Sequence, residues 1–403
     1  METAMSNAAQ LPTFDLNEPG AQDELYERYA DLRSKSRVVH SDRFGGYYML
    51  TRYEDIKAAL TQPDLFASGQ GVTIPHFGLP IPALPLEADP PEHKAFRALL
   101  LPLFRPRQVA KFGEYVEEVT AELIDAFIER GEADLKAELC EVVPSRLTEL
   151  FLGLQDGEWQ RLRSFGPRLL QTSREQLLAE NEEVARELMS FFREVLDRKR
   201  ADPKDDLLSL LVTAEVDGAP LAPDQVLGMA ILVGEAGHAT TIRSLTSTFL
   251  MLGLDMELRQ RLIDDPALIP ATINEILRLE APSQMFARTV TRDCEFAGHR
   301  FKAGDKVGIL FGSGNRDDKV FDRPDEVDLE RKPNPHLSFG VGIHRCVGEP
   351  LARLEMQVVI EQVLRRLPDY RLKDPDNVEW LPGFRRELAT LPVTFSAGAR
   401  TTG

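Results

Sequence analysis

The sequence predicts a single, mainly α-helical domain with a smaller β region. Two observations predict this fold class: a nearly continuous helical periodicity from Glu92 to about Leu254, and short strand-like runs before and after it. No repeat or flexible linker interrupts the chain. We therefore expect a flexible N-terminal arm over residues 1–20 and one domain over residues 21–403.

The elements follow in chain order from their periodicity and from Gly and Pro breaks. Before the helical block we expect strands at 38–40 and 47–50, joined by a turn at Gly45-Gly46, and a short helix at 53–60. The clearest helices within the block are 107–129, 176–200 and 223–254. After it we expect helices at 270–279 and 351–367, and strands at 294–296, 300–301, 306–310 and 391–395.

Composition excludes several classes of protein. The apolar share of 43% and the charged share of 28% are globular values. The net charge of 48 − 65 = −17 argues against a nucleic-acid partner. Three widely spaced cysteines form no disulfide framework and no C-x-x-C site. Because the chain shows neither a secretory signal nor a run of 18 apolar residues, we expect a cytoplasmic protein without a membrane span.

The stretch 339–348, FGVGIHRCVG, is the most informative part of the chain. It places Cys346 in a glycine-rich turn just before a helical run that starts near Glu349. The positive end of a helix stabilises a thiolate. A lone thiolate without a second ligand at chelating spacing suits a metal whose other ligands belong to a cofactor. We interpret Cys346 as an axial ligand of haem iron, although an isolated cysteine is more often structural.

The helix expected at 223–254 is apolar nearly all round in its first half, so it should cross the core. Its interior Gly228, Gly234 and Gly237 each cost about 1 kcal/mol relative to Ala. We interpret them as room for a ligand against the helix. The small and hydroxyl residues 236–241 suit such a ligand, and an ordinary buried helix explains them equally well.

Two further pairs of residues have an ordinary explanation when each is taken alone. Glu275 and Arg278 share a helix face at i, i+3, as many surface ion pairs do. His93 and Arg97 share a face at i, i+4 and could clamp carboxylates, while a solvated helix face is the more frequent explanation. Residues 69–90 hold eight Gly or Pro, yet remain apolar, and a long apolar loop is usually functional.

Together and in this order, these motifs resemble the cytochrome P450 family over about residues 26–395. The stretch 339–348 is similar to the family's haem loop, and Glu275-x-x-Arg278 to its structural Glu–Arg pair. Residues 236–241 are similar to its oxygen-side helix. The resemblance implies a single-domain cytochrome P450 fold, in which haem b lies between a long central helix and the cysteine loop.

The resemblance also implies roles for single residues. Cys346 is the axial ligand of the iron, and Thr240 steadies bound dioxygen and helps to protonate it. The haem propionates are held by His93, Arg97, Arg288 and His344. Further haem contacts are Ala236, Gly237, Phe339, Gly340 and Gly348. Substrate contacts are Thr73, Ile74, Phe77, Leu79, Ile81, Leu84, Met285 and Phe286, with the variable stretch 165–180 as a further region.

The implied reaction inserts one atom of O2 into a C–H bond or an alkene of an apolar small molecule and reduces the other atom to water. The chain has no dinucleotide motif and no cluster-binding cysteines, so electrons must come from outside. We expect an acidic ferredoxin, docked on the basic side chains of residues 92–111 together with Arg345 and Arg353. We further expect a monomeric protein of secondary metabolism.

Two positions depart from the family's pattern. Ala239 stands where the family usually has an acid that relays protons, and Glu235 lies about 140° around the helix from Thr240. Glu326 stands where many members have an arginine that completes the Glu–Arg network. Ala239 also fits a haem-thiolate enzyme without oxygen insertion, similar to the fungal nitric-oxide reductases. A haem protein that only binds or senses is the third hypothesis.

Overall fold

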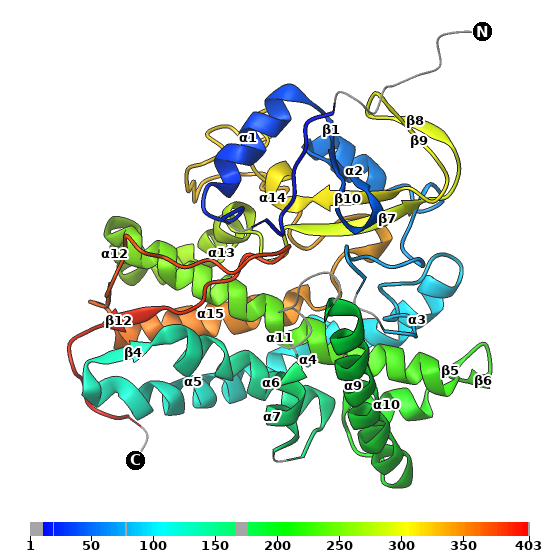
Figure 1. Cartoon of the computed structure of the whole chain (residues 1–403). Coiled ribbons are helices and arrows are strands. Elements are labelled where there is room, and N and C mark those ends of the chain that lie inside the picture. Colours follow the sequence, from blue (N-terminus) through cyan, green and yellow to red (C-terminus); the bar gives the residue numbers. More distant parts are fainter. Residues whose placement is uncertain (1–10, 19, 77–78, 156, 166–175, 402–403) are drawn as a thin grey trace, which may run out of the picture. The chain divides into compact units, whose positions relative to one another are not determined.

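The chain forms two compact units, each assembled from three separate stretches (Figure 1). The computed structural model describes residues 11–18, 20–76, 79–155, 157–165 and 176–401. Unit 1 comprises Met1–Pro75, Asn274–Cys346 and Trp380–Glu387, and unit 2 comprises His76–Ile273, Val347–Glu379 and Leu388–Gly403. This division does not test the prediction of one domain over residues 21–403, which stays a prediction.

Unit 1 is built on a five-stranded sheet in the order β1-β2-β10-β7-β3, antiparallel except for the β10–β2 pair (Figure 1). The strands are β1 Val38–Ser41, β2 Tyr47–Leu50, β3 Phe66–Ala67, β7 Met285–Val290 and β10 Lys306–Leu310. The sequence predicted β1, β2 and β10. It missed β7, because β7 is buried on nearly every position and lacks the alternation of a half-exposed strand.

Short helices and a hairpin complete unit 1: α1 Leu25–Lys35, α2 Tyr53–Leu60, α14 Phe311–Gly314, β8 Cys294–Phe296 and β9 His299–Phe301. Part of the expected N-terminal arm also packs here. Phe14 N–H donates to the carbonyl oxygen of His40 (3.0 Å), and Phe14 and Leu16 are buried. This packing differs from the expectation of a loose arm, because these apolar side chains enter the core.

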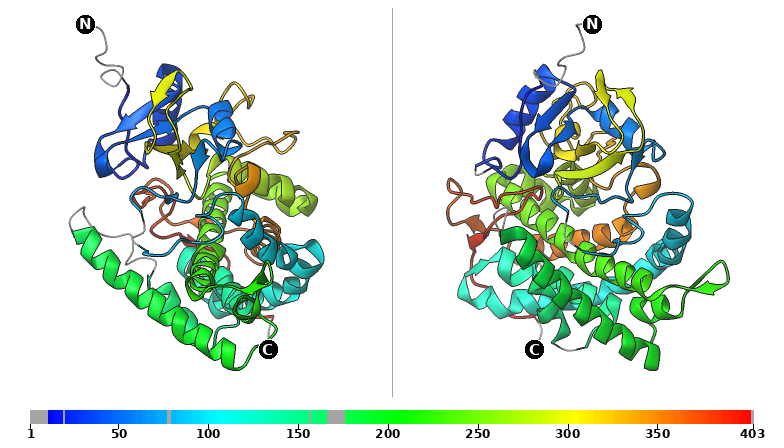
Figure 2. Two further views of the ribbon diagram at one scale, coloured as in Figure 1. Left: turned by 90° about the vertical axis from the view of Figure 1, so that its right-hand side faces the viewer. Right: turned by 45° about the vertical axis from the view of Figure 1, so that its right-hand side comes forward.

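Unit 2 is mostly helical. Its helices are α3 Glu92–Leu100, α4 Pro106–Val109, α5 Gly113–Phe127, α6 Val142–Leu152, α7 Glu158–Arg163, α9 Gln176–Ala201, α10 Leu207–Thr213, α11 Pro223–Leu254, α12 Met256–Asp264 and α15 Glu349–Arg366. α13, Ile269–Leu279, leads into unit 1. The prediction of α11 is confirmed at both ends, and α9 is one long continuous helix, as Figure 2 shows. The helix predicted at 107–129 is instead broken before Gly113.

The remaining elements are short. Strands β4 Glu132–Asp134, β11 Arg371–Leu372 and β12 Pro392–Thr394 form one sheet of unit 2, and β5 Glu215–Val216 pairs with β6 Ala219–Pro220. The 3-10 turns are Arg43–Gly45, Leu101–Phe104, Ala110–Phe112, Ile128–Arg130, Pro266–Leu268 and Gly342–His344, with one π-helical turn at Lys136–Cys140. Residues 79–90 contain no regular element, as predicted for the apolar loop.

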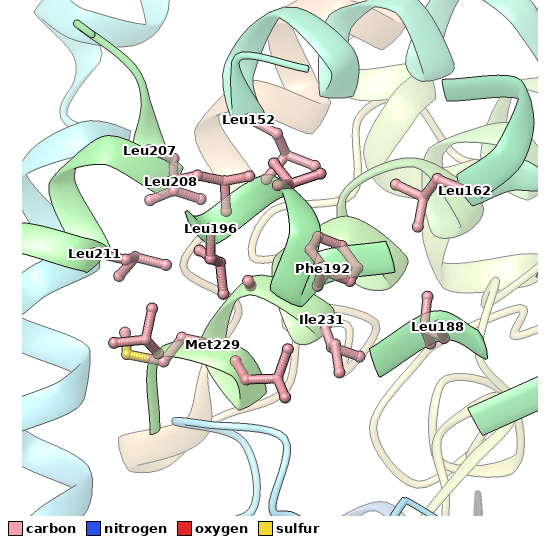
Figure 3. Close-up of a cluster of buried hydrophobic side chains, with 14 of the residues drawn as sticks. Leu152, Leu162, Leu188, Phe192, Leu196, Leu207, Leu208, Leu211, Met229 and Ile231 are labelled. Atoms are coloured by element: carbon pink, nitrogen blue, oxygen red, sulfur yellow. The ribbon is translucent and has the colours of Figure 1, made fainter. Parts of the chain in front are cut away.

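Two groups of helices determine where α11 lies within unit 2. In the first, α5 contacts α6, α6 contacts α11, α11 contacts α15, and α15 contacts α5, so the four helices form a closed ring. In the second, buried side chains of α6, α7, α9, α10 and α11 point toward one another, with Phe192 and Ile231 among them (Figure 3). Burial of this apolar area stabilises the packing by about 25 cal/mol per Å².

Among the residues that the structure describes, no helix combines the length and the apolar character needed to cross a membrane. The cytoplasmic location stays a prediction.

At two of the three interior glycines of α11, other parts of the protein fill the space where a side chain would lie. A Cβ at Gly228 would lie 2.2 Å from the carbonyl oxygen of Pro82, and a Cβ at Gly234 would lie 2.7 Å from Cζ of Phe192. The interpretation of these two glycines as room for a ligand is therefore wrong. At Gly237 the nearest atom would lie 3.4 Å away, which is ordinary contact.

We predict that Gly228→Ala lowers the free energy of unfolding by up to about 2 kcal/mol. Ala favours a helix over Gly by about 1 kcal/mol, but overpacking against the Pro82 carbonyl costs about 1–3 kcal/mol. Gly113→Ala is the matched control, since its Cβ would meet only Leu354 at 4.0 Å. Urea denaturation of both variants measures the difference. Equal stability of the two variants would contradict the assigned contact.

Candidate functional site

In unit 1, Cys346 lies at the end of a tightly turned, exposed loop. Its N–H donates to the carbonyl oxygen of Phe339 (2.7 Å), which closes the loop. Gly340 and Gly342 have φ of +67° and +74°, where side chains are strained. A Cβ at Gly342 would also lie 2.7 Å from the carbonyl oxygen of Leu60. Cys346 itself is an exposed residue.

Three hydrogen bonds fasten the segment before this loop to the helices of unit 1. Leu337 N–H donates to Asn315 Oδ1 (2.6 Å), and Asn315 Nδ2 donates to Ser338 Oγ (2.8 Å). Ser338 Oγ in turn donates to the carbonyl oxygen of Leu277 on α13 (2.5 Å). The cysteine loop is therefore held by residues that are distant in sequence.

The Glu275–Arg278 pair of α13 is fully buried, with side-chain exposures of 1% and 0%. Arg278 Nε and Nη2 donate to both carboxylate oxygens of Glu275 (2.8 and 2.9 Å). The same guanidinium donates to the carbonyl oxygens of Asn315, Pro324 and Glu326 (3.2, 2.5 and 2.8 Å). The pair is therefore not the surface ion pair that its spacing alone favours.

A second arginine, Arg331, completes this network. Its Nε lies 3.1 Å from Oε1 of Glu275, and Asn334 Nδ2 donates to the same oxygen (2.9 Å). Asp328 N–H donates to Oε2 (2.8 Å). Glu326 contributes its carbonyl oxygen to this network, and the second cation beside Glu275 is Arg331.

The network keeps Glu275 ionised. Burial favours the neutral carboxyl, but the hydrogen bonds from Arg278 and Asp328 and the charges of Arg278 and Arg331 outweigh it, so the pKa lies below its usual value of 4.5. The stabilisation is present above that value and is lost as the pH falls through the lower pKa of the folded state.

Two predicted propionate ligands also lie in unit 1. His344 has Nε2 3.1 Å from Ser68 Oγ. Arg288 on β7 is buried, and its Nη1 donates to the carbonyl oxygen of Ala287 (2.7 Å). Sequence analysis missed Ser68, because it is 276 residues from His344 and carries no local motif.

The predicted substrate residues of unit 1 lie around β7. Met285, Thr73 and Ile74 are buried, while Phe286 is half-buried. The Phe286 ring lies 5.9 Å from the ring of Phe311 and 6.4 Å from that of Phe384, centre to centre. Sequence analysis also missed Phe384, which lies in an irregular segment without a motif.

In unit 2, the centre of α11 has one uncovered face. Ala236 and Gly237 are exposed and Thr240 is half-buried, although most of the helix is buried. Thr240 Oγ1 donates to the carbonyl oxygen of Ala236 (3.3 Å). Two small residues and one hydroxyl on one face leave room for a flat group.

His238 lies on another face of the same turn. Its ring packs edge-on against Trp159 of α7 (4.7 Å between ring centres), and its Nδ1 lies 2.8 Å from the carbonyl oxygen of Gly234. It is 8% exposed. His238 therefore stabilises the α7–α11 contact.

His93 and Arg97 lie on α3 in unit 2, where His93 is buried and Arg97 is half-buried. Burial, followed by the charge of Arg97, lowers the pKa of His93, so its imidazole is neutral at neutral pH. A neutral imidazole still donates one N–H and the guanidinium donates several, which suits carboxylate oxygens.

The rest of the predicted substrate loop packs in unit 2. Leu84 belongs to the α9–α11 core, and Leu79 and Ile81 pack against it. Phe77 lies outside the described residues, as do residues 166–175 of the variable stretch. This packing is enough to explain why Leu79, Ile81 and Leu84 are apolar, and their contact with substrate stays a prediction.

The residues present fit a haem. Unit 1 offers an exposed thiol for an axial bond and two side chains that donate to carboxylates, Arg288 and His344. Unit 2 offers a helix face of small residues and a second pair of donors, His93 and Arg97. Among the described residues no group of three or more His, Cys, Asp or Glu could hold a metal ion.

Comparison with known proteins agrees with this chemistry. Residues 158–394 match the family model described as Cytochrome P450. A steroid C26-monooxygenase of Mycobacterium tuberculosis (strain ATCC 25618 / H37Rv) is 33% identical, over 96% of this chain and 98% of its own. Mycinamicin IV hydroxylase/epoxidase of Micromonospora griseorubida is 32% identical, over 92% and 96%. A solved myxobacterial cytochrome P450 in complex with myristic acid superposes with a TM-score of 0.88 at 30% identity, over 94% and 98%.

We predict that Arg331→Met lowers the free energy of unfolding by about 3 kcal/mol, because the buried Glu275 charge loses one of its two cations. Arg323→Met is the control from the same segment. Arg323 is 53% exposed and pairs with Glu326 and Asp328 near the surface, so its loss should cost less than about 1 kcal/mol. Urea denaturation compares them, and similar losses would exclude the network described.

Proposed function

Since the chain belongs to the cytochrome P450 family of haem b monooxygenases, we propose that Cys346 supplies the axial thiolate. We propose that the protein inserts one oxygen atom of O2 into an apolar small molecule, by hydroxylation or epoxidation. The observation that carries this proposal is the exposed Cys346 at the end of a loop that its own N–H closes onto Phe339, shortly after a segment that Glu275 binds. The haem, when bound, supplies the activation of O2.

The residues of the chain have separate tasks in this proposal. His93, Arg97, Arg288 and His344 bind the propionates and so fix the orientation of the cofactor. Ala236 and Gly237 leave space for O2 and substrate on their face of α11, in support of which both are exposed. Thr240 holds a proton at its hydroxyl beside the reacting oxygen.

Proton supply decides how much product this chemistry gives. The overall reaction consumes substrate, O2, two electrons and two protons and yields oxygenated product and water. When protons are not delivered at the right time, the two electrons and two protons reduce O2 to hydrogen peroxide, and the substrate is not oxygenated. Ala239 has no proton to give, so the supply to Thr240 must come from another group.

An apolar substrate is supported by Phe286 on β7, which is half-buried and lies beside the rings of Phe311 and Phe384. It is also supported by what the names of similar proteins state, which are a steroid, mycinamicin IV and, as a bound ligand, myristic acid. A steroid and a fatty acid have a large apolar surface with few polar groups, and such ligands gain most of their binding energy from burial.

We further propose an acidic ferredoxin as the electron donor. Lys94, Arg105, Arg107 and Lys111 are exposed, and none makes an ion pair with a residue that the structure describes. On a protein of net charge −17, four unpaired cations within 18 residues attract an acidic partner. Arg353 contributes less than expected, because Glu349 already pairs with it (3.0 Å). The monomeric state also stays a prediction.

We predict that terpenoids, steroids, fatty acids or aromatic compounds shift the Soret band toward high spin, and that at least one of them is oxygenated. With labelled O2, the product should carry one labelled oxygen atom. Cys346→Ser is the control and should lose the thiolate spectrum of the reduced carbon-monoxide adduct. A spin shift with reduction of nitric oxide but no product would support the reductase alternative. No turnover at all would support a sensor.

We predict that the double variant Arg105→Gln/Arg107→Gln lowers the rate of reduction by an acidic ferredoxin about tenfold at low salt, because charge attraction accelerates encounter. Its rate should also depend less on salt. The charge-matched control is Arg300→Gln/Lys302→Gln at the exposed end of β9. Stopped-flow reduction measures both variants, and equal rates for the two would exclude this docking surface.

A further inference from the structure

Ser283 and Arg385 form an isolated antiparallel pair within unit 1. Two backbone hydrogen bonds flank the pair, one from the N–H of Gln284 (2.7 Å) and one from the N–H of Arg386 (3.2 Å). Two residues that face each other between such bonds place their side chains on one face of the strand pair and close together. A hydroxyl and a guanidinium therefore emerge at the same point of unit 1.

Both side chains are accessible, although the chain around them is largely buried. In residues 281–290 every residue is buried except Ser283 and Phe286, which are half-buried. Arg385 is also half-buried, between two buried neighbours. The Ser283 hydroxyl makes no hydrogen bond with a residue that the structure describes. A ligand on this face could therefore accept a hydrogen bond from Ser283.

Aromatic rings border the pair. The guanidinium carbon of Arg385 lies 5.3 Å from the ring centre of Phe384. The ring of Phe286 lies 6.4 Å from that of Phe384 and 5.9 Å from that of Phe311. A cation thus lies beside an aromatic surface, as in small-molecule sites that combine an apolar lining with a few polar groups.

The segment that carries Arg385 is held in place. The N–H of Leu381 donates to the carbonyl oxygen of Glu387 (2.8 Å), which closes a short loop. Within this loop the carbonyl oxygen of Gly383 accepts from Nε2 of Gln22 (2.6 Å). Because the loop is fixed before a ligand arrives, less conformational freedom is lost on binding.

The neighbouring Arg386 has a different task. It is 6% exposed, and its Nε donates to Oε2 of Glu280 (2.9 Å). Its guanidinium carbon also lies 3.4 Å from the ring centre of Trp380. Arg386 therefore ties the loop to the rest of unit 1. Arg385 is the more exposed of the two arginines, so its charge is the one that a ligand can reach.

The chemistry of the pair fits a carboxylate. A guanidinium and a hydroxyl both donate hydrogen bonds, and a carboxylate accepts on two oxygens. One cation balances the single negative charge of a carboxylate, whereas a phosphate monoester carries about 1.5 to 2 negative charges. The net charge of −17 repels anions from the protein as a whole, so an acid must gain its affinity from a local cation.

We propose that Arg385 and Ser283 determine specificity by binding the carboxylate of an apolar acid. The proposal rests on the proposed oxygenation and names its substrate class. The carboxylate accepts from the guanidinium and the hydroxyl, and the apolar part of the acid lies against Phe286 and Phe384. Because one end of the substrate is fixed, its distance from the carboxylate decides which carbon atoms react.

The test compares myristic acid with its methyl ester, which has the same chain and no negative charge. We expect the wild-type holoenzyme to bind the acid about 10–100-fold more tightly, because the ester lacks the charge that the guanidinium binds. Arg385→Gln should lose this preference and bind the ester as the wild type does. The spin shift of the Soret band and calorimetry measure both dissociation constants. Equal affinity of the wild type for acid and ester would overturn the proposal.

Three further variants make the result specific. Ser283→Ala should weaken binding of the acid about fivefold, since one hydrogen bond is lost. Arg385→Lys keeps the charge without the planar fork and should keep part of the preference. Arg300→Gln removes a cation at the exposed end of β9 and should bind both compounds as the wild type does. If Arg385→Gln weakens acid and ester alike, or Arg300→Gln weakens the acid as much, the carboxylate site is excluded.

Binding and turnover together separate this proposal from the proposed function. If the acid binds in preference to the ester and no compound is oxygenated, the proposed function fails while the carboxylate site stands. If a neutral compound is oxygenated and the acid shows no preference, the function stands and the site fails. When both stand, the wild type should oxygenate myristic acid at fewer positions than Arg385→Gln does, and an equal spread of products would count against the anchor.

Discussion

One buried charge, on Glu275, binds the segment that leads toward the cysteine loop. The carboxylate of Glu275 accepts from Arg278, Arg331 and Asn334 and from the N–H of Asp328. Most of these donors come from a segment without regular structure, so no ladder of backbone hydrogen bonds could hold it. A buried carboxylate that loses a partner is costly, on the order of 3 kcal/mol or more. The segment is thereby fastened to α13, a few residues before the cysteine loop begins.

The small residues of α11 meet two different needs. Gly228 and Gly234 let a loop carbonyl and an aromatic ring approach the helix, and Ala236 and Gly237 leave a face uncovered. The first pair allows close packing of the helix, and the second pair leaves its centre exposed. The sequence alone cannot distinguish these cases. A glycine looks the same in the local sequence whether another part of the protein or a ligand packs against it.

What the sequence predicts well is local. α2, α11 and β10 end where periodicity and breakers indicate, since each depends on neighbouring residues. The cysteine loop is also local, because its glycines and its cysteine are adjacent. β7, Ser68 and Arg331 could not be predicted this way. β7 lacks alternation, and the partners of Ser68 and Arg331 lie 276 and 56 residues away.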